Sequence, residues 1–217
     1  MINKYTGIYT DIADYYDLLV KAGNYDHQAL ANVAHLIIGE SRKILEIGVG
    51  TGLLAKKLLD IQPKYEYTGV DISPPMLDIA KGRLGERAKL IEGDFLDTEF
   101  ADTFDVVISS AGVWTILERE DEYDLGSYIL DLKKNIAGLQ KVAKCLHSNG
   151  YLLLSGQASS CLGMQKKRET NIGDDITYSY EIEEIEQNSD YYSTEKRYFF
   201  KQGNKTLSEE KIRFKFF

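Results

Sequence analysis

A short apolar run at residues 43–47 leads into the glycine-rich turn Glu46-Ile-Gly-Val-Gly-Thr-Gly52, and Leu53, Leu54 and Leu58 follow at helical spacing. This pattern indicates a buried strand, a tight turn and a helix. Glycines in such a turn let backbone N–H groups approach a ligand closely, and they aim the helix N-terminus at negative charge. The sequence therefore predicts an α/β domain with a ligand site on this turn.

Apolar runs and helical patterns alternate along the first three quarters of the chain. Helices are expected at residues 11–19 and 26–38, from Pro74 onward, and from about 129 to 146; further strands are expected at 65–70, 89–92, 105–109 and 151–154. This order favours a doubly wound, mainly parallel, Rossmann-like sheet with two N-terminal helices and right-handed crossovers.

The character of the sequence changes after Ser155. A polar stretch at 158–175 precedes alternating segments at 176–185, 191–200 and 207–217, with Gly203-Asn204 as a turn signal between the last two. We expect residues 1–157 to form the Rossmann-like core with a helical N-terminal lid, and residues 158–217 to form an antiparallel β extension.

Composition narrows the functional classes. A chain of 217 residues with 43% hydrophobic content suits one domain with a small appendage, and a net charge of -8 argues against nucleic acid as a partner. The two cysteines, Cys145 and Cys161, lack the spacing of a disulfide framework or zinc site, so we expect reduced thiols, no metal, and a cytoplasmic location. No apolar run approaches the roughly 20 residues of a membrane span or resembles a signal peptide.

The glycine turn by itself leaves two cofactors open. Gly50-x-Gly52-x-x-Ala55 also satisfies the dinucleotide fingerprint, and Asp71 follows at about the distance that an NAD-binding site requires. A carboxylate at the end of the second strand can accept both hydroxyls of a ribose. The turn and Asp71 thus indicate an adenosine cofactor without identifying it.

Five ordered segments resemble the motifs of class I S-adenosylmethionine-dependent methyltransferases, over roughly residues 40–157. They are Ile44-Leu-Glu-Ile-Gly-Val-Gly-Thr-Gly-Leu-Leu, Tyr67-Thr-Gly-Val-Asp-Ile-Ser-Pro-Pro-Met-Leu-Asp-Ile-Ala-Lys, Glu92-Gly-Asp-Phe, Asp105-Val-Val-Ile-Ser-Ser, and Leu146-His-Ser-Asn-Gly-Tyr-Leu-Leu-Leu-Ser. The small-molecule N-methyltransferases that act on glycine and on amino sugars are the most similar subgroup.

The resemblance implies that S-adenosylmethionine is the cofactor and S-adenosylhomocysteine the product. The glycines would line its methionine part with Glu46 near the amino group, Asp71 would hold the ribose, and Asp94 would accept from the adenine amine. The implied cofactor-binding residues are Tyr25, Glu46, Gly48, Gly50, Gly52, Leu53, Asp71, Ile72, Met76, Asp94, Phe95, Ser109 and Ser110. Each has an ordinary structural alternative: the glycines a plain turn, Met76 and Phe95 core packing, and Asp94 a cap.

The acceptor is expected beyond the carboxyl end of the fourth strand, where open parallel sheets bind ligands. Candidates there are Gly112 and Trp114, and Tyr15, Tyr16 and Tyr25 resemble the N-terminal lid of the N-methyltransferases. Trp114 and the tyrosines could equally be packing residues. The acidic run at 118–124 could attract a cationic amine or form a solvated loop.

The expected reaction is in-line methyl transfer to a small-molecule or short-peptide amine, carboxylate or hydroxyl. Because the sulfonium carries an activated methyl group, no general base is assigned, and His27, His35 and His147 are not expected to be catalytic. An NAD(P)-binding oxidoreductase and a catalytically silent S-adenosylmethionine-binding module remain as alternatives.

The end of the chain departs from the family pattern. Members of the family follow the fifth strand with a helix and a hairpin that completes seven strands, whereas here three alternating segments follow and end at Phe216-Phe217. We expect a fragment or domain whose open sheet edge is covered by a homodimer partner or by its parent polypeptide.

Overall fold

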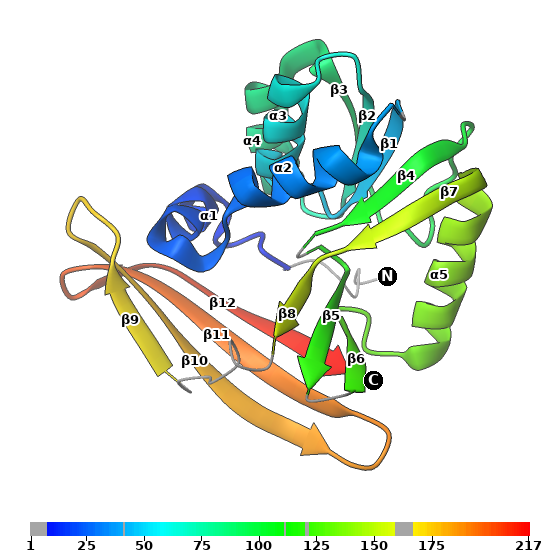
Figure 1. The fold of residues 1–217 in the computed structure, drawn as a ribbon. Coiled ribbons are helices and arrows are strands. Elements are labelled where there is room, and N and C mark those ends of the chain that lie inside the picture. Colours follow the sequence, from blue (N-terminus) through cyan, green and yellow to red (C-terminus); the bar gives the residue numbers. More distant parts are fainter. Residues whose placement is uncertain (1–7, 41, 111, 120–121, 159–166) are drawn as a thin grey trace.

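The computed structural model describes residues 8–40, 42–110, 112–119, 122–158 and 167–217, which form two sheets with helices packed around the first (Figure 1). The first sheet is parallel, and its strands are β1 (Lys43–Ile47), β2 (Glu66–Asp71), β3 (Ala88–Glu92), β4 (Phe104–Ser109) and β7 (Leu146–Leu154), in the order β3-β2-β1-β4-β7. This order confirms the doubly wound, Rossmann-like core. The strand order reverses between β1 and β4, so the glycine turn that follows β1 lies at the switch point, where such sheets bind ligands.

Helices cover both faces of the parallel sheet. They are α1 (Ala13–Leu19), a π-helical turn (Val20–Asn24), α2 (His27–Ile38), α3 (Leu53–Ile61), α4 (Pro74–Leu84), a 3₁₀ turn (Gly85–Arg87) and α5 (Leu132–Cys145). Helices α2, α3 and α4 pack on one face around Ile44 and Val106, whereas α5 packs on the other around Leu45 and Val107. Alternate residues of one strand thus enter opposite cores, as expected for a sheet buried on both faces.

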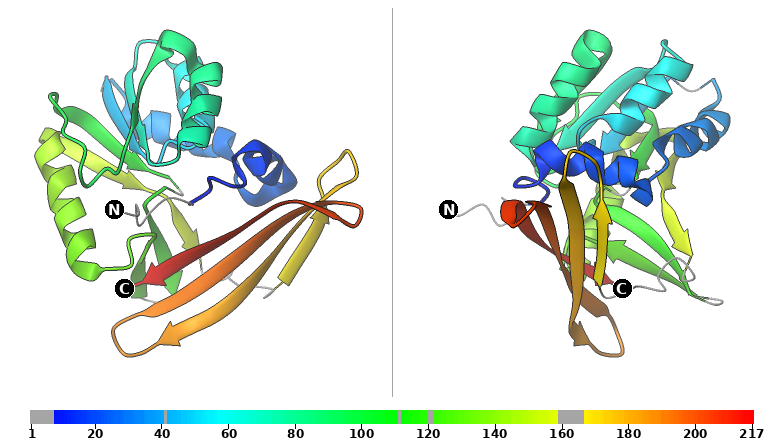
Figure 2. Two further views of the ribbon diagram at one scale, coloured as in Figure 1. Left: turned by 180° about the vertical axis from the view of Figure 1, so that it is seen from behind. Right: turned by 90° about the vertical axis from the view of Figure 1, so that its left-hand side faces the viewer.

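The second sheet has seven strands and is mostly antiparallel. It contains β5 (Trp114–Arg119), β6 (Glu122–Ser127), β8 (Gly156–Ala158), β9 (Lys167–Asn171), β10 (Ile176–Gln187), β11 (Tyr192–Gln202) and β12 (Lys205–Phe216), in the order β8-β5-β6-β12-β11-β10-β9. Gly203 lies at φ 56° in the turn between β11 and β12, as the sequence predicts. The sheet curls beneath the core, and its concave side faces α1 (Figures 1 and 2).

Two parts of this sheet differ from the sequence-based expectation. Strands β5 and β6 come from residues 114–127, for which the sequence analysis expected no strand and gave a solvated loop as one alternative at 118–124, and β9 comes from the polar stretch before residue 175. Glu118, Glu122 and Tyr123 are exposed, so the acidic segment is solvated as part of two paired strands.

In the first sheet, the parallel strand β7 begins at Leu146, five residues before the apolar run that predicted it.

The described part of the chain contains no helix that is both long and apolar enough to cross a membrane. Cys145 is a buried free thiol, and Cys161 lies outside the described residues.

Candidate functional site

The glycine turn needs glycine at its first position for two reasons. Gly48 lies at φ 77°, and a Cβ built there would lie 2.8 Å from the Cα of Gly112 in the segment after β4. Its N–H donates to the carbonyl of Val70 (2.8 Å), which ties the turn to β2. The turn therefore sits against two neighbouring segments, with Gly50 (φ 54°) and Gly52 (φ 76°) completing the bend into α3.

Asp71 at the end of β2 is held by the backbone. Gly50 N–H donates to its Oδ2 (2.7 Å), and Ser73 N–H donates to its Oδ1 (2.9 Å). Burial raises the pKa of this carboxyl, and the N–H donors of Ser73, Gly50 and Ile72 oppose that rise. The glycine turn and the carboxylate thus form one unit, as expected if both contact the same ligand.

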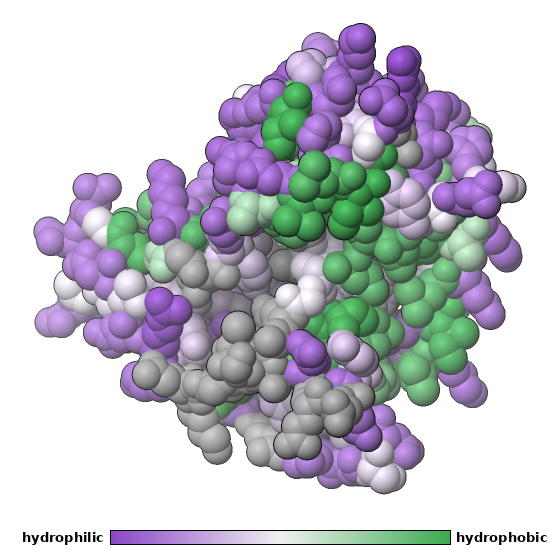
Figure 3. Space-filling view, viewed as in Figure 1, coloured by the Kyte–Doolittle hydropathy of each residue, from purple (hydrophilic) through white to green (hydrophobic). Residues whose placement is uncertain are grey.

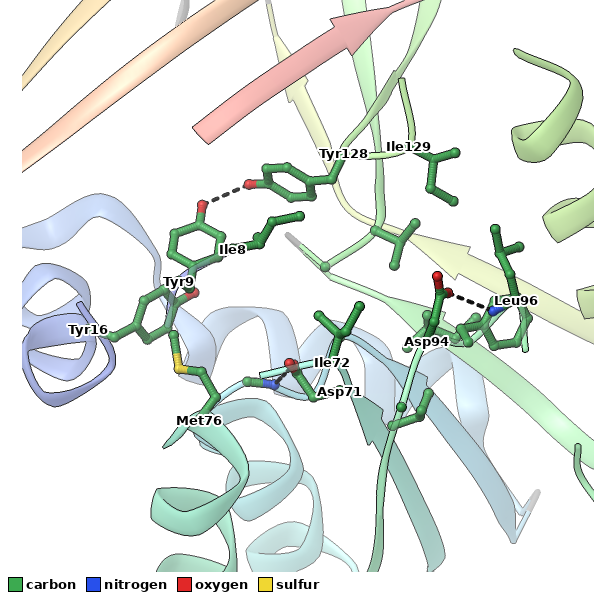
Figure 4. A pocket seen from close by; sticks show the side chains of 18 residues that line it. Ile8, Tyr9, Tyr16, Asp71, Ile72, Met76, Asp94, Leu96, Tyr128 and Ile129 are labelled. Atoms are coloured by element: carbon green, nitrogen blue, oxygen red, sulfur yellow. Dashed lines mark hydrogen bonds between the residues drawn. The ribbon is translucent and has the colours of Figure 1, made fainter. Parts of the chain in front are cut away.

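A pocket of about 840 Å³, counted out to its open mouth, lies beyond the carboxyl ends of β1, β2 and β3 (Figure 4). The lining residues are Ile8, Tyr9, Tyr16, Ile47, Gly48, Gly50, Val70, Asp71, Ile72, Met76, Gly93, Asp94, Phe95, Leu96, Gly112, Val113, Tyr128 and Ile129.

The structure brings nine of the residues named from sequence into this lining: Gly48, Gly50, Asp71, Ile72, Met76, Asp94, Phe95, Tyr16 and Gly112. The others lie around it without lining it: Tyr15, Tyr25, Glu46, Gly52, Leu53, Ser109, Ser110 and Trp114. Tyr15 stacks on Phe200 of the second sheet (ring centroids 5.0 Å apart), and Tyr25 lies beside His27 (6.1 Å).

Glu46 lies near the end of β1, two residues before Gly48, and is not among the residues that line the pocket. Its side chain is 2% exposed, and its Oε2 accepts a hydrogen bond from the Tyr67 hydroxyl (2.8 Å). Burial raises the pKa of Glu46 to about 8, the Tyr67 hydrogen bond opposes the rise, and the nearby Asp71 adds to it. The Glu46 side chain is therefore held by Tyr67 of β2 and lies close enough to Asp71 for their charges to interact.

Trp114 is fully buried, so the packing alternative describes its position. Its Nε1–H donates to Asn135 Oδ1 (2.7 Å), which also accepts from the Ser127 hydroxyl (2.7 Å). Its ring meets the edge of Phe95 (6.0 Å), and its backbone N–H donates to Ser109 Oγ (3.0 Å). The tryptophan thus stands one layer behind the pocket wall and supports Phe95.

Asp94 both stabilises a turn and lines the pocket. Its Oδ1 accepts from Leu96 N–H (2.8 Å), which closes the turn after β3, and the residue also lines the pocket (Figure 4). Phe95 is 3% exposed, and it likewise belongs both to the core and to the pocket wall.

Sequence reasoning missed the residues that close the mouth of the pocket. Residues 8–12, which we name the clasp segment, place Ile8 and Tyr9 over it, and Tyr128 reaches it from the segment after β6. The Tyr9 and Tyr128 hydroxyls are hydrogen-bonded (2.7 Å), and the Tyr9 ring contacts Tyr16 edge-on (5.4 Å; Figure 4). Tyr9 and Tyr128 are 119 residues apart, so no local pattern could have linked them.

Burial raises the pKa of Tyr9, Tyr16 and Tyr128, and neighbouring tyrosines raise it further. The three phenols are therefore neutral near pH 7. They offer hydroxyl groups and aromatic faces at the mouth without a fixed charge.

Helix α1 is pinned to the glycine turn by Asp17. The Thr51 hydroxyl donates to its Oδ1 (2.8 Å), and Arg83 of α4 pairs with its Oδ2 while also donating to the carbonyl of Thr51. The Arg83 and Asp17 side chains are 16% and 32% exposed. This cluster, which the sequence analysis did not identify, fixes the helix that carries Tyr16.

The described lining of the pocket contains no histidine, lysine or cysteine. His35 contacts the Tyr65 hydroxyl (2.7 Å), and His147 lies by Thr103 (3.1 Å). Burial lowers the pKa of His27, whose Nδ1 has no described partner. Within the described ranges, no group of three or more His, Cys, Asp or Glu side chains is arranged to hold a metal ion.

Comparison with known proteins places these features in a family context. Residues 44–135 match the family described as a methyltransferase domain. A malonyl-[acyl-carrier protein] O-methyltransferase of Anoxybacillus flavithermus is 43% identical over 76 residues, which are 35% of this chain and 29% of the relative. An uncharacterized methyltransferase of Geobacillus sp. is 31% identical over 140 residues, covering 62% of this chain and 65% of the relative. The matches thus span less than two thirds of the length of these relatives.

Solved structures share the whole fold at low sequence identity. Streptomyces venezuelae DesVI superposes with a TM-score of 0.67 at 18% identity, covering 94% of this chain and 82% of that protein. The sugar N-methyltransferase KedS8 from Streptoalloteichus sp. gives a TM-score of 0.64 at 18% identity, covering 98% and 81%. The coverage of this chain includes the antiparallel sheet as well as the core.

The order of strands in the parallel sheet, the glycine turn at its switch point and the match over residues 44–135 agree with one another. The resemblance inferred from the five sequence motifs is thereby confirmed: residues 44–135 match a methyltransferase domain, and the chain has the Rossmann-like fold of the similar solved structures.

Proposed function

We propose that this chain is an enzyme that binds S-adenosylmethionine and transfers its methyl group to a small acceptor. The observation that carries the proposal is the hydrogen bond from Gly50 N–H to the Asp71 carboxylate, because both residues line the pocket. Gly48 also lines the pocket, and its backbone lies against Gly112 with no room for a Cβ between them. An adenosyl ligand fits this lining. The hydroxyls of its ribose can donate to a carboxylate, and its flat adenine ring suits the apolar residues.

In this proposal, different residues of the lining contact the ribose, the adenine and the methionine part of the cofactor. Asp71 would accept from the ribose hydroxyls, Ile72, Met76 and Phe95 would contact the adenine faces, and Asp94 would accept from the adenine amine. The backbone of Gly48 and Gly50 would border the methionine part. When bound, the cofactor supplies a methyl group already activated by the positive charge of its sulfonium.

The chain's own contribution is positioning and the exclusion of water. Tyr9, Tyr16 and Tyr128 would close over the acceptor, and their aromatic faces favour a cation nearby. Because the described part of the lining offers no histidine or lysine, we expect the acceptor to arrive with its nucleophilic atom unprotonated, or to lose its proton to solvent.

The acceptor in this proposal is a small-molecule or short-peptide amine, carboxylate or hydroxyl. The names of the similar proteins include a sugar N-methyltransferase and a malonyl-[acyl-carrier protein] O-methyltransferase, so nitrogen and carboxylate oxygen are both reasonable targets. A net charge of -8 disfavours nucleic acid as the acceptor. The cytoplasm is the proposed compartment, since the buried free thiol of Cys145 suits a reducing environment.

Titration calorimetry with S-adenosylmethionine, S-adenosylhomocysteine and NAD tests the cofactor assignment. We expect both adenosyl compounds to bind with one site per chain and NAD to show no comparable heat. Tighter binding of NAD would refute the proposal and favour an oxidoreductase. Cofactor binding without turnover of any amine, carboxylic acid or alcohol in a panel would instead identify a silent binding module.

A further inference from the structure

The turn that follows β3 carries three residues of the pocket lining, and hydrogen bonds within it close it. We name residues 94–98 the Asp94 turn. Leu96 N–H donates to Asp94 Oδ1 (2.8 Å), and Thr98 N–H donates to the Asp94 carbonyl (2.9 Å). Asp94, Phe95 and Leu96 all line the pocket (Figure 4). The direction of the Asp94 carboxylate is therefore set in part by the main chain of Leu96.

Lys141 of α5 holds the other side of that main chain. Its ammonium nitrogen donates to the Leu96 carbonyl (2.9 Å), and it lies 5.5 Å from the ring centroid of Phe95 and 6.0 Å from that of Phe100. Leu96 is thus fixed at its N–H by Asp94 and at its carbonyl by Lys141. A cation this close to an aromatic ring is attracted to the ring, so the same ammonium group also helps to hold Phe95.

Helix α5 packs closely behind this wall of the pocket. Gly138 lies one turn before Lys141, and a Cβ built on it would lie 2.7 Å from the indole ring of Trp114 and 3.1 Å from the side chain of Leu96. Trp114 in turn meets Phe95 edge-on. Lys141 therefore extends from a helix that already touches both supports of the wall.

The Asp94 carboxylate has one oxygen left for a ligand. Its Oδ1 is taken by Leu96 N–H, and among the described residues its Oδ2 accepts no hydrogen bond. A carboxylate oxygen only accepts, so it favours a ligand that presents an amine over one that presents a carbonyl at the same place. How strongly it discriminates depends on how firmly the turn is held.

We propose that Lys141 is a positioning residue that orients the Asp94 turn through the Leu96 carbonyl and the Phe95 ring, and thereby sets specificity for the amine of adenine. This inference deepens the proposed function and rests on it, because the adenine contact of Asp94 is part of that function.

Calorimetric titration with two compounds that differ at the adenine amine tests this role. S-adenosylhomocysteine carries the amine, whereas S-inosylhomocysteine carries a carbonyl at that position. We expect the wild-type chain to prefer S-adenosylhomocysteine by about tenfold or more, because the carbonyl gives the Asp94 carboxylate no donor. Lys141→Met should reduce this preference about threefold or more, the usual weight of one modest hydrogen bond. Lys141→Arg keeps a cation and N–H donors and should retain most of it.

Lys144→Met is the matched control, because Lys144 is an exposed lysine of the same helix, and its preference should equal that of the wild type. If Lys141→Met weakened binding of both compounds by the same factor, Lys141 would serve the fold alone and the inference would be overturned. Lys141→Gln has a shorter side chain and should reduce the preference likewise, so it replaces Lys141→Met if that variant does not fold.

The wild-type titrations separate the two levels of the argument. Binding of neither compound would refute the proposed function and the inference with it. Binding of S-adenosylhomocysteine with no preference over S-inosylhomocysteine would leave the cofactor assignment standing and overturn the inference alone.

Amide hydrogen exchange in the ligand-free chain provides a readout that is independent of the cofactor. Leu96 N–H should exchange about threefold faster or more in Lys141→Met than in the wild type, because the turn is less restrained, while the N–H groups of β1 keep their rates. Lys144→Met should match the wild type at both places. An unchanged rate at Leu96 in Lys141→Met would contradict a positioning role for this lysine.

Discussion

At the scale of single residues, the shape of the site depends on two glycines, where any side chain would collide with neighbouring backbone. Gly48 lies at positive φ against the Cα of Gly112, and a Cβ built on Gly112 would lie 2.3 Å from the carbonyl oxygen of Ile47. The two glycines therefore allow the segment after β4 to close on the turn after β1. That close approach forms one wall of the pocket.

Gly48→Ala should destabilise the chain by roughly 2–4 kcal/mol, through positive-φ strain and overpacking together. Thermal or urea unfolding measures the change. Gly82→Ala is the matched control: Gly82 is an exposed residue of α4 with open space around it, and alanine there should add about 0.5–1 kcal/mol of stability. Equal stability of the two variants would show that the turn is not as tightly packed as described.

Glu46 makes stability depend on pH. Its pKa is about 8 in the folded chain against an ordinary 4.5, so the folded state binds this proton more tightly than the unfolded state does. Its contribution to stability is complete below pH 4.5 and is lost as the pH rises through about 8.

Glu46→Gln removes this titration while keeping an oxygen that can accept from Tyr67. The variant should therefore gain stability relative to wild type as the pH is raised from 5 to 8, as measured by urea unfolding at both values. A wild-type-to-variant difference that stays constant over this range would place the carboxyl in a more polar environment than the structure does.

The cofactor half of the lining could be predicted from sequence, because its residues occur in short segments with fixed order. The turn glycines, Asp71, Ile72 and Asp94 lie at or just after the ends of β1, β2 and β3, and parallel strands bring their carboxyl ends together. Tyr9 and Tyr128 could not be predicted, since they are 119 residues apart and meet only through the second sheet.

At the scale of elements, strands and helices with strong periodicity were predicted within a few residues, whereas weak strands were missed. Strand β1 was predicted with its observed bounds, and α2 begins after Asp26, whose carboxylate caps its first turn through Ala29 N–H (2.9 Å). Strands β5, β6 and β9 carry many polar residues on their exposed side. Their pairing comes from partners distant in sequence, which a local pattern does not contain.

The position of α1 depends on the Asp17 cluster. Arg83→Met removes the guanidinium that joins Asp17 to the carbonyl of Thr51 while keeping much of the apolar stem. Amide hydrogen exchange in residues 13–19 should become about tenfold faster or more, and S-adenosylhomocysteine affinity should fall because Tyr16 is less fixed.

Arg87→Met provides the control for this variant. Arg87 pairs with Asp60 at an exposed site away from the pocket, so its loss should leave exchange in α1 unchanged. If the Arg83 and Arg87 variants exchanged alike in residues 13–19, the cluster would not be the anchor of the helix.

At the scale of the whole molecule, the parallel sheet presents an apolar edge. Strand β7 is the last strand in the order, and exposed apolar side chains flank it on both sides (Figure 3). On α2 they are Val33, Leu36 and Ile37, and near the start of α5 they are Leu130, Leu132 and Ile136. Gathered apolar side chains beside an open strand edge are typical of an interface.

We predict that two copies of this chain associate across this edge. Light scattering at increasing concentration should show a dimer, and the double variant Leu36→Lys, Ile136→Lys should shift it to the monomer without changing S-adenosylhomocysteine affinity. A monomeric wild type at high micromolar concentration would contradict the homodimer.

The account as a whole depends on one proposed contact, the hydrogen bonds between Asp71 and the ribose of the cofactor. Calorimetric titration of S-adenosylhomocysteine into the wild-type chain, Asp71→Asn and the exposed control Asp97→Asn measures it most directly. We predict that Asp71→Asn weakens binding by about tenfold or more while Asp97→Asn leaves it unchanged. Equal affinity of all three would contradict the assignment of this pocket to an adenosyl cofactor.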